Sequence, residues 1–236
     1  MWRDPSNNTV MTEISGIAAA FAPFETLASA LLQHIKTDDG SHDVAHLARV
    51  WANARTIQAV EGGDIEILAA ATLLHDCVAV EKNSPLRAQT SRLAADHAMT
   101  LLAPFGWAND RLDRIAHAIA AHSFSAKIAP ETIEAKILQD ADRLDAIGAI
   151  GIARCFYTAG RMQSFLYDAE DPAARHRALD DRAFAIDHLP AKLLTLAEGF
   201  NTAEGKRMAQ ERHARTEAFL AAFMSEVGAA SEQARR

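Results

Sequence analysis

The sequence predicts an all-α protein. Apolar residues recur at three- and four-residue steps through most of the chain, which is the period of an amphipathic helix. Aromatic residues make up only 6% of the chain, and no long run alternates apolar and polar side chains as a half-exposed strand would. Short clusters of Gly, Pro, Asp and Ser separate the periodic segments, as turns between helices do.

The first two expected helices are marked by an apolar stripe and by a cap. Residues 14–36 carry one broad apolar stripe, and a turn at residues 38–40 ends it. Ser41 is the expected N-cap of the second helix, and Asp43 in the first turn is favoured by the helix dipole. This helix is expected to stop at Gly62-Gly63. The later helices are expected near residues 64–76, 86–103, 109–123, 131–159, 171–183, 187–199 and 203–228.

The overall charge disfavours some partners. The net charge is -7 and the pI is near 5.8, whereas a chain that coats nucleic acid or an anionic membrane is expected to present a basic face. The longest apolar stretch, residues 17–24, is too short to span a bilayer. We therefore expect no nucleic-acid and no membrane partner. A small phosphorylated ligand stays compatible with this charge, because a bound metal can reverse the field inside one pocket.

The cysteines and the N-terminus indicate a cytoplasmic protein. Cys77 and Cys155 are isolated, with no CxxC pair and no disulfide framework. No basic segment followed by an apolar stretch, as in a secretion signal, begins the chain. Cys77 lies in an Ala/Leu/Val-rich segment without a cationic neighbour, so we interpret it as a small buried residue rather than a nucleophile.

Four polar residues in expected helices form a candidate metal site. They are His46, the adjacent pair His75-Asp76, and Asp142. Two imidazoles and two carboxylates suit a divalent transition metal that activates water. The apolar run LAAATLLHDCVAV contains the adjacent polar pair His75-Asp76, and burying both groups without a partner costs several kcal/mol. A cation that both groups coordinate removes that cost.

Each of these residues also has an ordinary structural interpretation. A single histidine such as His46 on an apolar helix face is often a packed, hydrogen-bonded residue. Asp142 lies close to Asp140 and Asp145 in the chain, and Arg143 offsets the negative charge of these aspartates only in part. Like charges this close are destabilising unless a positive group is near. The case for a metal therefore depends on the four residues together.

The segments SHDVAHLARV, LLHDCV and ILQDADRLDAIGAIGIAR resemble the HD-domain superfamily of metal-dependent phosphohydrolases. The resemblance covers residues 40–155 and continues less specifically to about residue 225. It implies a single-domain HD helical bundle over residues 1–236, with its core at about 40–155 and a C-terminal helical extension at about 160–228. It also implies one divalent metal ion per chain (Mn, Ni, Co, Fe or Mg), held by His46, His75, Asp76 and Asp142.

Further site residues follow from the same resemblance. His42, one turn before His46, is an alternative first ligand. We prefer His46, because an aliphatic residue, Val50, follows one turn later as in the superfamily. The run HSFS at His122 resembles a branch of small bacterial HD proteins associated with nucleotide pyrophosphohydrolase activity. His122 is therefore a candidate catalytic residue together with Asp76.

Charged residues near these motifs complete the candidate site. Glu81 could orient or deprotonate the attacking water, and Lys82 could bind phosphate. Arg87, Lys127 and Arg143 are candidates for substrate binding. For each of these charges a solvated surface position is the alternative.

Three functions remain open at this point. The first is hydrolysis of a phosphate ester or anhydride in a small phosphorylated metabolite, foremost a nucleoside or deoxynucleoside triphosphate giving monophosphate and pyrophosphate. The second is an HD-fold module that senses a nucleotide without turnover, and the third is a structural helical protein. The sequence contains no GxxxxGK[ST], GxSxG or HExxH motif, which disfavours P-loop, α/β-hydrolase and zincin chemistry.

Overall fold

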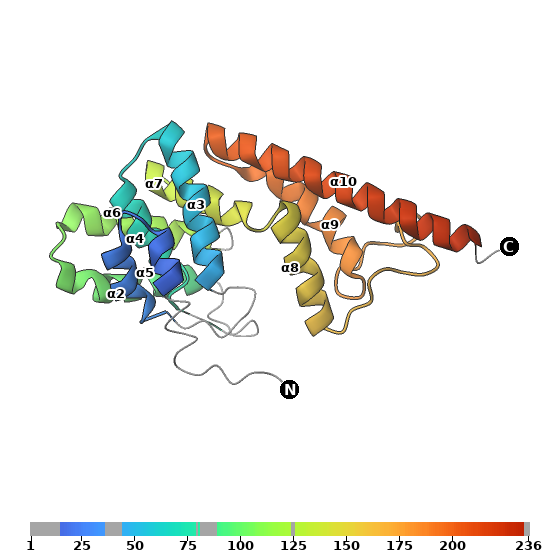
Figure 1. Ribbon diagram of the computed structural model, residues 1–236, viewed down its shortest axis with the longest axis horizontal. Helices are drawn as coiled ribbons and strands as arrows, with labels where there is room; N and C mark the ends of the chain where they lie inside the picture. The colour runs from blue at the N-terminus through green and yellow to red at the C-terminus, as the bar shows by residue number, and fades with distance from the viewer. Residues whose placement is uncertain (1–14, 36–43, 79, 81–88, 124–125, 234–236) are drawn as a thin grey trace. The chain divides into compact units, whose positions relative to one another are not determined.

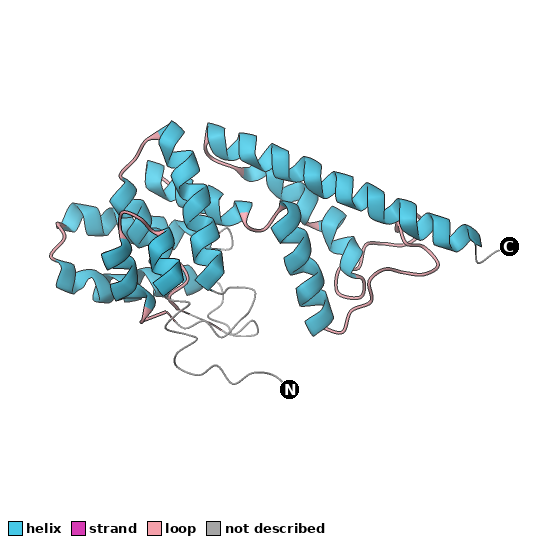
Figure 2. Cartoon of the chain, in the orientation of Figure 1, coloured by secondary structure: helices cyan, strands magenta, loops and turns pink. Residues whose placement is uncertain are grey.

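The computed structural model describes residues 15–35, 44–78, 80, 89–123 and 126–233. Within these residues the regular secondary structure is helical (Figure 2). The only β-type pairing in them is an isolated bridge between Phe165 and Phe184. The prediction of an all-α protein is confirmed. The chain falls into two compact units, residues 1–142 and 143–236. The single domain expected over the whole chain stays a prediction.

The first unit is built around one fully buried helix. Its elements are α2 (Glu25–Leu32), α3 (Val44–Glu61), α4 (Ile65–Leu74), α5 (Thr90–Leu102), a 3-10 turn (Ala103–Phe105), α6 (Asn109–His122) and α7 (Ile133–Leu144), whose last two residues belong to the second unit. Helix α4 packs against α2, α3, α5 and α6 (Figure 1). Every residue from Ile67 to Leu74 is buried, as expected for a helix that is apolar all round. The chain that follows α4 therefore starts inside the protein.

The helix expected over residues 14–36 is interrupted. The structure has a helix at 15–20, a turn at 21–23, and then α2. Pro23 explains the break, because proline lacks the backbone N–H that a helix interior requires. Phe21 stacks on Trp51 of α3 with ring centroids 5.2 Å apart, and Phe24 meets the same ring edge-on. These contacts attach the N-terminal segment to α3.

The second unit has its own apolar core. Its elements are α8 (Gly148–Arg161), a 3-10 turn (Ala185–Asp187), α9 (His188–Ala191), a 3-10 segment (Leu193–Gly199) and the long helix α10 (Ala203–Gln233). The buried cluster consists of Ile152, Cys155, Ile186, Leu189 and Leu193. Aromatic side chains of α10, Phe219 and Phe223, pack against this cluster. None of the helices in the described residues has both the length and the apolar character that a bilayer-crossing helix needs.

The prediction of a single helix over residues 131–159 is wrong, because α7 and α8 are separate helices. Gly148, the first residue of α8, has φ +72°, a left-handed conformation that favours glycine. A Cβ on Gly151 would lie 2.2 Å from the carbonyl oxygen of Ala146. The two glycines of the DAIGAIGIAR run therefore permit a tight turn between the two helices.

The prediction of a helix over residues 171–183 is also wrong, because this segment consists of turns. Asp171 accepts the backbone N–H groups of Arg175 and His176, and Asp180 accepts those of Arg182 and Ala183. Aspartate side chains that bond nearby backbone in this way compete with helix formation. Residues 187–199 are short α and 3-10 pieces rather than one helix. The helices expected at 41–60, 64–76, 86–103, 109–123 and 203–228 correspond to α3, α4, α5, α6 and α10.

Candidate metal centre

The candidate ligands lie at helix ends within the first unit. His46 is in the first turn of α3, and His75-Asp76 directly follow α4. His122 is the last residue of α6, and Asp142 lies in the last turn of α7. Three helices, α4, α6 and α7, thus end at the site, and the negative ends of their dipoles favour a cation there.

The donor atoms of four residues converge. His46 Nε2 lies 3.3 Å from His75 Nε2, 3.4 Å from Asp142 Oδ1 and 3.9 Å from Asp76 Oδ2. His75 Nε2 lies 3.5 Å from Asp76 Oδ2 and 3.9 Å from Asp142 Oδ1. Ligands about 2.1 Å from one ion stand about 3.0 to 3.4 Å apart in octahedral or tetrahedral geometry. The spacing and the chemistry of this donor set therefore fit a divalent metal ion.

The orientation of His75 also fits metal binding. Its Nδ1 lies 2.8 Å from the carbonyl oxygen of Thr72, which can only accept, so Nδ1 carries the proton. In the neutral ring the Nε2 lone pair is then directed at His46 and the two carboxylates. A backbone carbonyl that fixes the tautomer in this way is the usual partner of a metal-bound imidazole.

His122 has the same arrangement. Its Nδ1 lies 2.6 Å from the carbonyl oxygen of Ile119, and its Nε2 lies 3.6 Å from Asp76 Oδ1. The ring meets that of His75 edge-on, with centroids 4.9 Å apart. Asp76 thus directs one carboxylate oxygen towards His46 and His75 and the other towards His122. Among the described residues, two overlapping groups could hold a metal ion: His46, His75 and Asp142, and His75, Asp76 and His122.

The imidazoles are buried and the carboxylates are reachable. The side chains of His46 and His75 are 2% and 0% exposed, whereas those of Asp76 and Asp142 are 35% and 32% exposed. An ion held by these four groups would be accessible from the carboxylate side. Such an open side is typical of catalytic metal sites, in which part of the coordination is left to water or substrate.

The electrostatics favour the protonation states that ligands need. Burial alone would raise the pKa of Asp76, but the imidazoles of His75, His122 and His46 outweigh it and hold this pKa well below its usual value. Burial is likewise outweighed at Asp142, mainly by His46, so that its pKa falls to about 2. Burial lowers the pKa of His75. Burial would lower the pKa of His122 too, but Asp76 raises it. At neutral pH both carboxylates are therefore ionised and His75 is neutral.

Buried polar side chains fix the helix ends that carry these residues. The carbonyl groups of Ala120 and Ala121 accept hydrogen bonds from Ser91 (2.9 Å) and Gln139 (2.7 Å). Asn53 Nδ2 donates to the carbonyl oxygen of Ala141 at 3.0 Å. These bonds satisfy carbonyls next to His122 and Asp142 that the helix itself leaves unpaired near its end.

Sequence reasoning missed these supporting residues, although a signal was present. Asn53 follows His46 by seven residues, and Gln139 precedes Asp142 by three, so each lies on the same helix face as a candidate ligand. A polar residue three or seven positions from a candidate ligand, on a helix face that is otherwise apolar, indicates such a supporting role.

The remaining predicted site residues are distributed differently. Glu81, Lys82, Arg87 and the alternative ligand His42 lie outside the described residues. Lys127 is exposed, with φ 52°.

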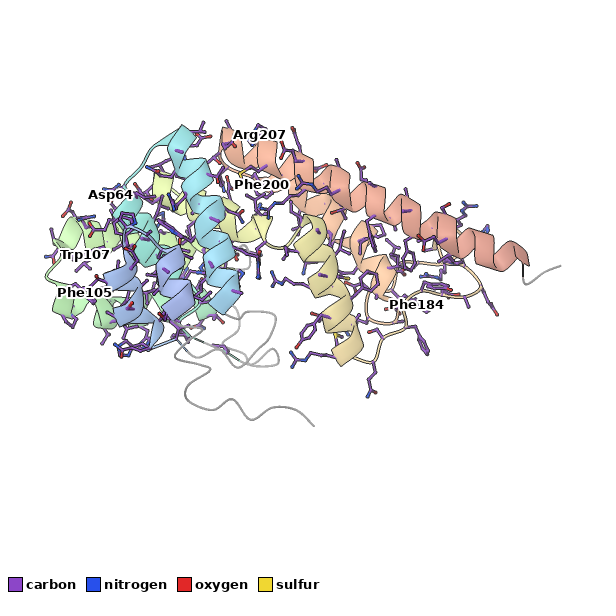
Figure 3. All side chains as sticks on the ribbon, in the orientation of Figure 1. Asp64, Phe105, Trp107, Phe184, Phe200 and Arg207 are labelled. Carbon is purple, nitrogen blue, oxygen red and sulfur yellow. The ribbon has the colours of Figure 1, made fainter. Side chains whose placement is uncertain are left out.

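Arg143 belongs to the second unit. It donates to the carbonyl oxygen of Gly199. Its guanidinium also lies over the ring of Phe200, a residue labelled in Figure 3, at 5.6 Å from the ring centroid. His97, a residue that a second metal could recruit, is exposed and belongs to neither group of possible ligands in the described part of the chain.

The fold and the cluster define a helical domain with a His, His-Asp, Asp set of side chains that could hold a metal ion. The family model of the HD domain matches residues 43–147. Bacillus subtilis YpgQ, itself uncharacterised, is 38% identical over 187 residues, which cover 77% of this chain and 83% of YpgQ. The chain belongs to the HD-domain superfamily.

Solved structures support this assignment. An HD-superfamily hydrolase from Bacillus thuringiensis superposes with a TM-score of 0.65 at 30% identity, covering 93% of this chain and 98% of that one. The Lin1889 protein from Listeria innocua gives 0.64 at 29% identity, covering 92% and 97%. YpgQ in complex with ADP gives 0.62 at 31% identity, covering 83% and 95%. The chain therefore has the fold of the HD-superfamily hydrolases.

Proposed function

We propose that the chain is a metal-dependent phosphohydrolase that acts on a small phosphorylated metabolite, foremost a nucleoside or deoxynucleoside triphosphate. The observation that carries the proposal is the convergence of His46, His75, Asp76 and Asp142 on one point that is open on its carboxylate side. We further propose a cytoplasmic location, which the two free cysteines support, because thiols stay reduced there.

The four converging residues would hold one divalent ion. When bound, such an ion lowers the pKa of water and polarises a phosphoryl oxygen. His75 is held by its bond to Thr72, so its Nε2 needs no reorientation to serve as a ligand. The second oxygen of Asp76, Oδ1, lies 3.6 Å from His122 Nε2, and we propose that it orients the attacking water together with this histidine.

His122 is the proposed proton carrier. Its Nδ1 is committed to Ile119, so Nε2 is the atom that exchanges a proton, and Asp76 Oδ1 lies 3.6 Å from it. An imidazole held beside an ionised carboxylate can take a proton from the attacking water or give one to the leaving oxygen. Glu81 and Lys82 are proposed to assist at the same step.

The nucleotide is proposed as substrate because the relative YpgQ forms a complex with ADP. Lys82, Arg87 and Lys127 are the proposed phosphate contacts. In the proposed reaction one water attacks the α-phosphorus, the bond from that phosphorus to the bridging oxygen breaks, and nucleoside monophosphate and pyrophosphate leave. Loss of the terminal phosphate would instead require attack of the water on the γ-phosphorus. The position of the bound nucleotide relative to the attacking water decides between the two reactions.

The test is a product analysis with a single deoxynucleoside triphosphate. Protein treated with chelator and reloaded with Mn²⁺ is incubated with the nucleotide, and the products are separated by ion-exchange chromatography. Monophosphate with pyrophosphate supports the proposal, and diphosphate with orthophosphate would replace it by a phosphatase. Mn²⁺ and nucleotide binding without turnover of any nucleotide would instead favour a sensor module.

Two variants make this test specific. Asp76→Asn keeps the side-chain shape but removes the charge, so it should abolish turnover. His97→Gln changes an exposed histidine outside the cluster and should leave turnover unchanged. Equal rates in wild type and Asp76→Asn would remove this centre from the reaction.

A further inference from the structure

A buried carboxylate lies at the start of α7, away from the candidate ligands. The Glu134 side chain has 0% exposure, and its Oε1 accepts hydrogen bonds from the backbone N–H of Asp64 (2.8 Å) and from Arg114 Nη2. A glutamate is rarely buried to this extent unless it is paired. These two bonds join the first turn of α7 to the N-cap of α4 and to α6.

Arg111 extends this connection. Asp64 caps α4 by accepting the N–H groups of Glu66 and Ile67 at 3.0 and 3.2 Å. Arg111 Nη2 lies 3.2 Å from both carboxylate oxygens of Asp64 and 2.8 Å from Glu66 Oε2. Its guanidinium lies over the ring of Trp107 (Asp64 and Trp107 are labelled in Figure 3). We name Asp64, Arg111, Arg114 and Glu134 the N-terminal clamp.

The clamp joins the beginnings of the three helices whose ends form the candidate metal centre. Helix α4 rises from Asp64 to His75, α6 from Asn109 to His122, and α7 from Ile133 past Asp142. At 1.5 Å per residue, the eight residues from Glu134 to Asp142 span about 12 Å. Glu134 thus lies far from the ligands but on a rigid element that carries one of them.

We propose that Glu134 is a positioning residue for the metal centre. It fixes the axial position of α7 against α4, and through Arg114 against α6, so that the donor atoms at the other ends of these helices converge. The inference rests on the proposed function, because it presupposes that these donors hold a metal. Metal–ligand distances tolerate deviations of only about 0.2 Å, so a small shift of one helix along its axis is enough to weaken binding.

The backbone beside Glu134 is shaped for this contact. Gly63 has φ +97°, and a Cβ there would lie 3.1 Å from Glu134 Oε1 and 3.1 Å from Ile133 Cγ2. Because no side chain separates the two segments, the turn before α4 comes close enough for the N–H of Asp64 to reach the carboxylate. The Gly62-Gly63 turn therefore belongs to the same arrangement.

The test measures metal binding rather than turnover. Mn²⁺ affinity is measured by calorimetry and the Co²⁺ absorption spectrum is recorded, both well below the melting temperature of each variant. Glu134→Leu removes the acceptor and should weaken Mn²⁺ binding by roughly tenfold or more, as loss of a supporting residue does, and should shift the Co²⁺ bands. Glu134→Gln keeps an oxygen for both donors and should bind close to wild type.

Two further variants separate positioning from stability. Arg114→Met removes the partly exposed partner of Glu134 and should also weaken Mn²⁺ binding. If Glu134→Leu does not fold, the Mn²⁺ affinity of Arg114→Met tests the positioning role instead. Leu31→Ala opens a cavity in α2, which carries no ligand, so it should lower the melting temperature but keep the wild-type affinity and spectrum.

Wild-type affinity and spectrum in Glu134→Leu, or in Arg114→Met where Glu134→Leu does not fold, would overturn the inference. A wild-type protein that binds neither metal would instead overturn the proposed metal centre itself.

Discussion

His122 Nε2 lies 3.6 Å from Asp76 Oδ1, whereas His46 and His75 face the other oxygen of the same carboxylate. Asp76 thus stands between the imidazoles of His46 and His75 on one side and the imidazole of His122 on the other. In the proposed function, this relationship separates the residues that would hold the metal from His122, the proposed proton carrier. Replacement of His122 and replacement of a proposed ligand should therefore have different effects.

Replacement of His122 should affect turnover more than metal binding. His122→Asn removes the proposed proton carrier but leaves His46, His75, Asp76 and Asp142 in place. We expect kcat for nucleotide hydrolysis to fall by about 100- to 10,000-fold, the usual contribution of general acid–base catalysis, with Mn²⁺ affinity near wild type. If Mn²⁺ binding, measured by calorimetry, were lost together with turnover, His122 would be identified as a metal ligand instead.

Two glycines of α8 offer a matched pair for stability. Gly148 has φ +72°, and a Cβ there would lie 3.0 Å from Arg212 Cβ, so Gly148→Ala should lower the free energy of unfolding by about 1–3 kcal/mol. Gly160 lies in the same helix, and a Cβ there would meet nothing within 4 Å beyond its chain neighbours and the adjacent helix backbone. Gly160→Ala should raise the free energy of unfolding by about 0.5 kcal/mol, because alanine is the better helix former. Urea denaturation measures both, and equal effects would contradict the turn geometry described for α8.

The two cysteines should resist alkylation in the folded protein. Burial raises the pKa of Cys77 to about 12 and that of Cys155 to about 11. At pH 8 both thiols are therefore almost wholly protonated, and the thiolate is the reactive form. Mass spectrometry after iodoacetamide treatment should find neither modified in native protein and both modified in urea. Rapid native modification of Cys77 would contradict its interpretation as a packing residue.

The sequence predicted those elements whose signal is local. Helices α3 to α6 and α10 follow from apolar periodicity, and the four candidate ligands follow from residue types that an apolar segment does not otherwise carry. The resemblance to the HD superfamily selected them from ten histidines and many acids. Their mutual distances required the structure, because they come from separate helices.

Other features were beyond local reasoning. The break between α7 and α8 depends on the positive φ of Gly148, which a helical apolar pattern conceals. Residues 171–183 fail to form a helix because Asp171 and Asp180 bind nearby backbone N–H groups, an alternative that apolar periodicity does not register. The N-terminal clamp pairs Asp64 with Glu134, seventy residues apart, and no spacing rule connects them.

The most direct test of the account is the number of metal ions that the chain binds. Chelator-treated protein is titrated with Mn²⁺, and free Mn²⁺ is followed by electron paramagnetic resonance. We predict one tightly bound ion per wild-type chain, and loss of that ion in both His46→Ala and Asp142→Ala, because each removes one of four converging donors. A wild-type chain that binds no Mn²⁺, or a bound ion that survives both replacements, would contradict the metal centre on which the proposed function rests.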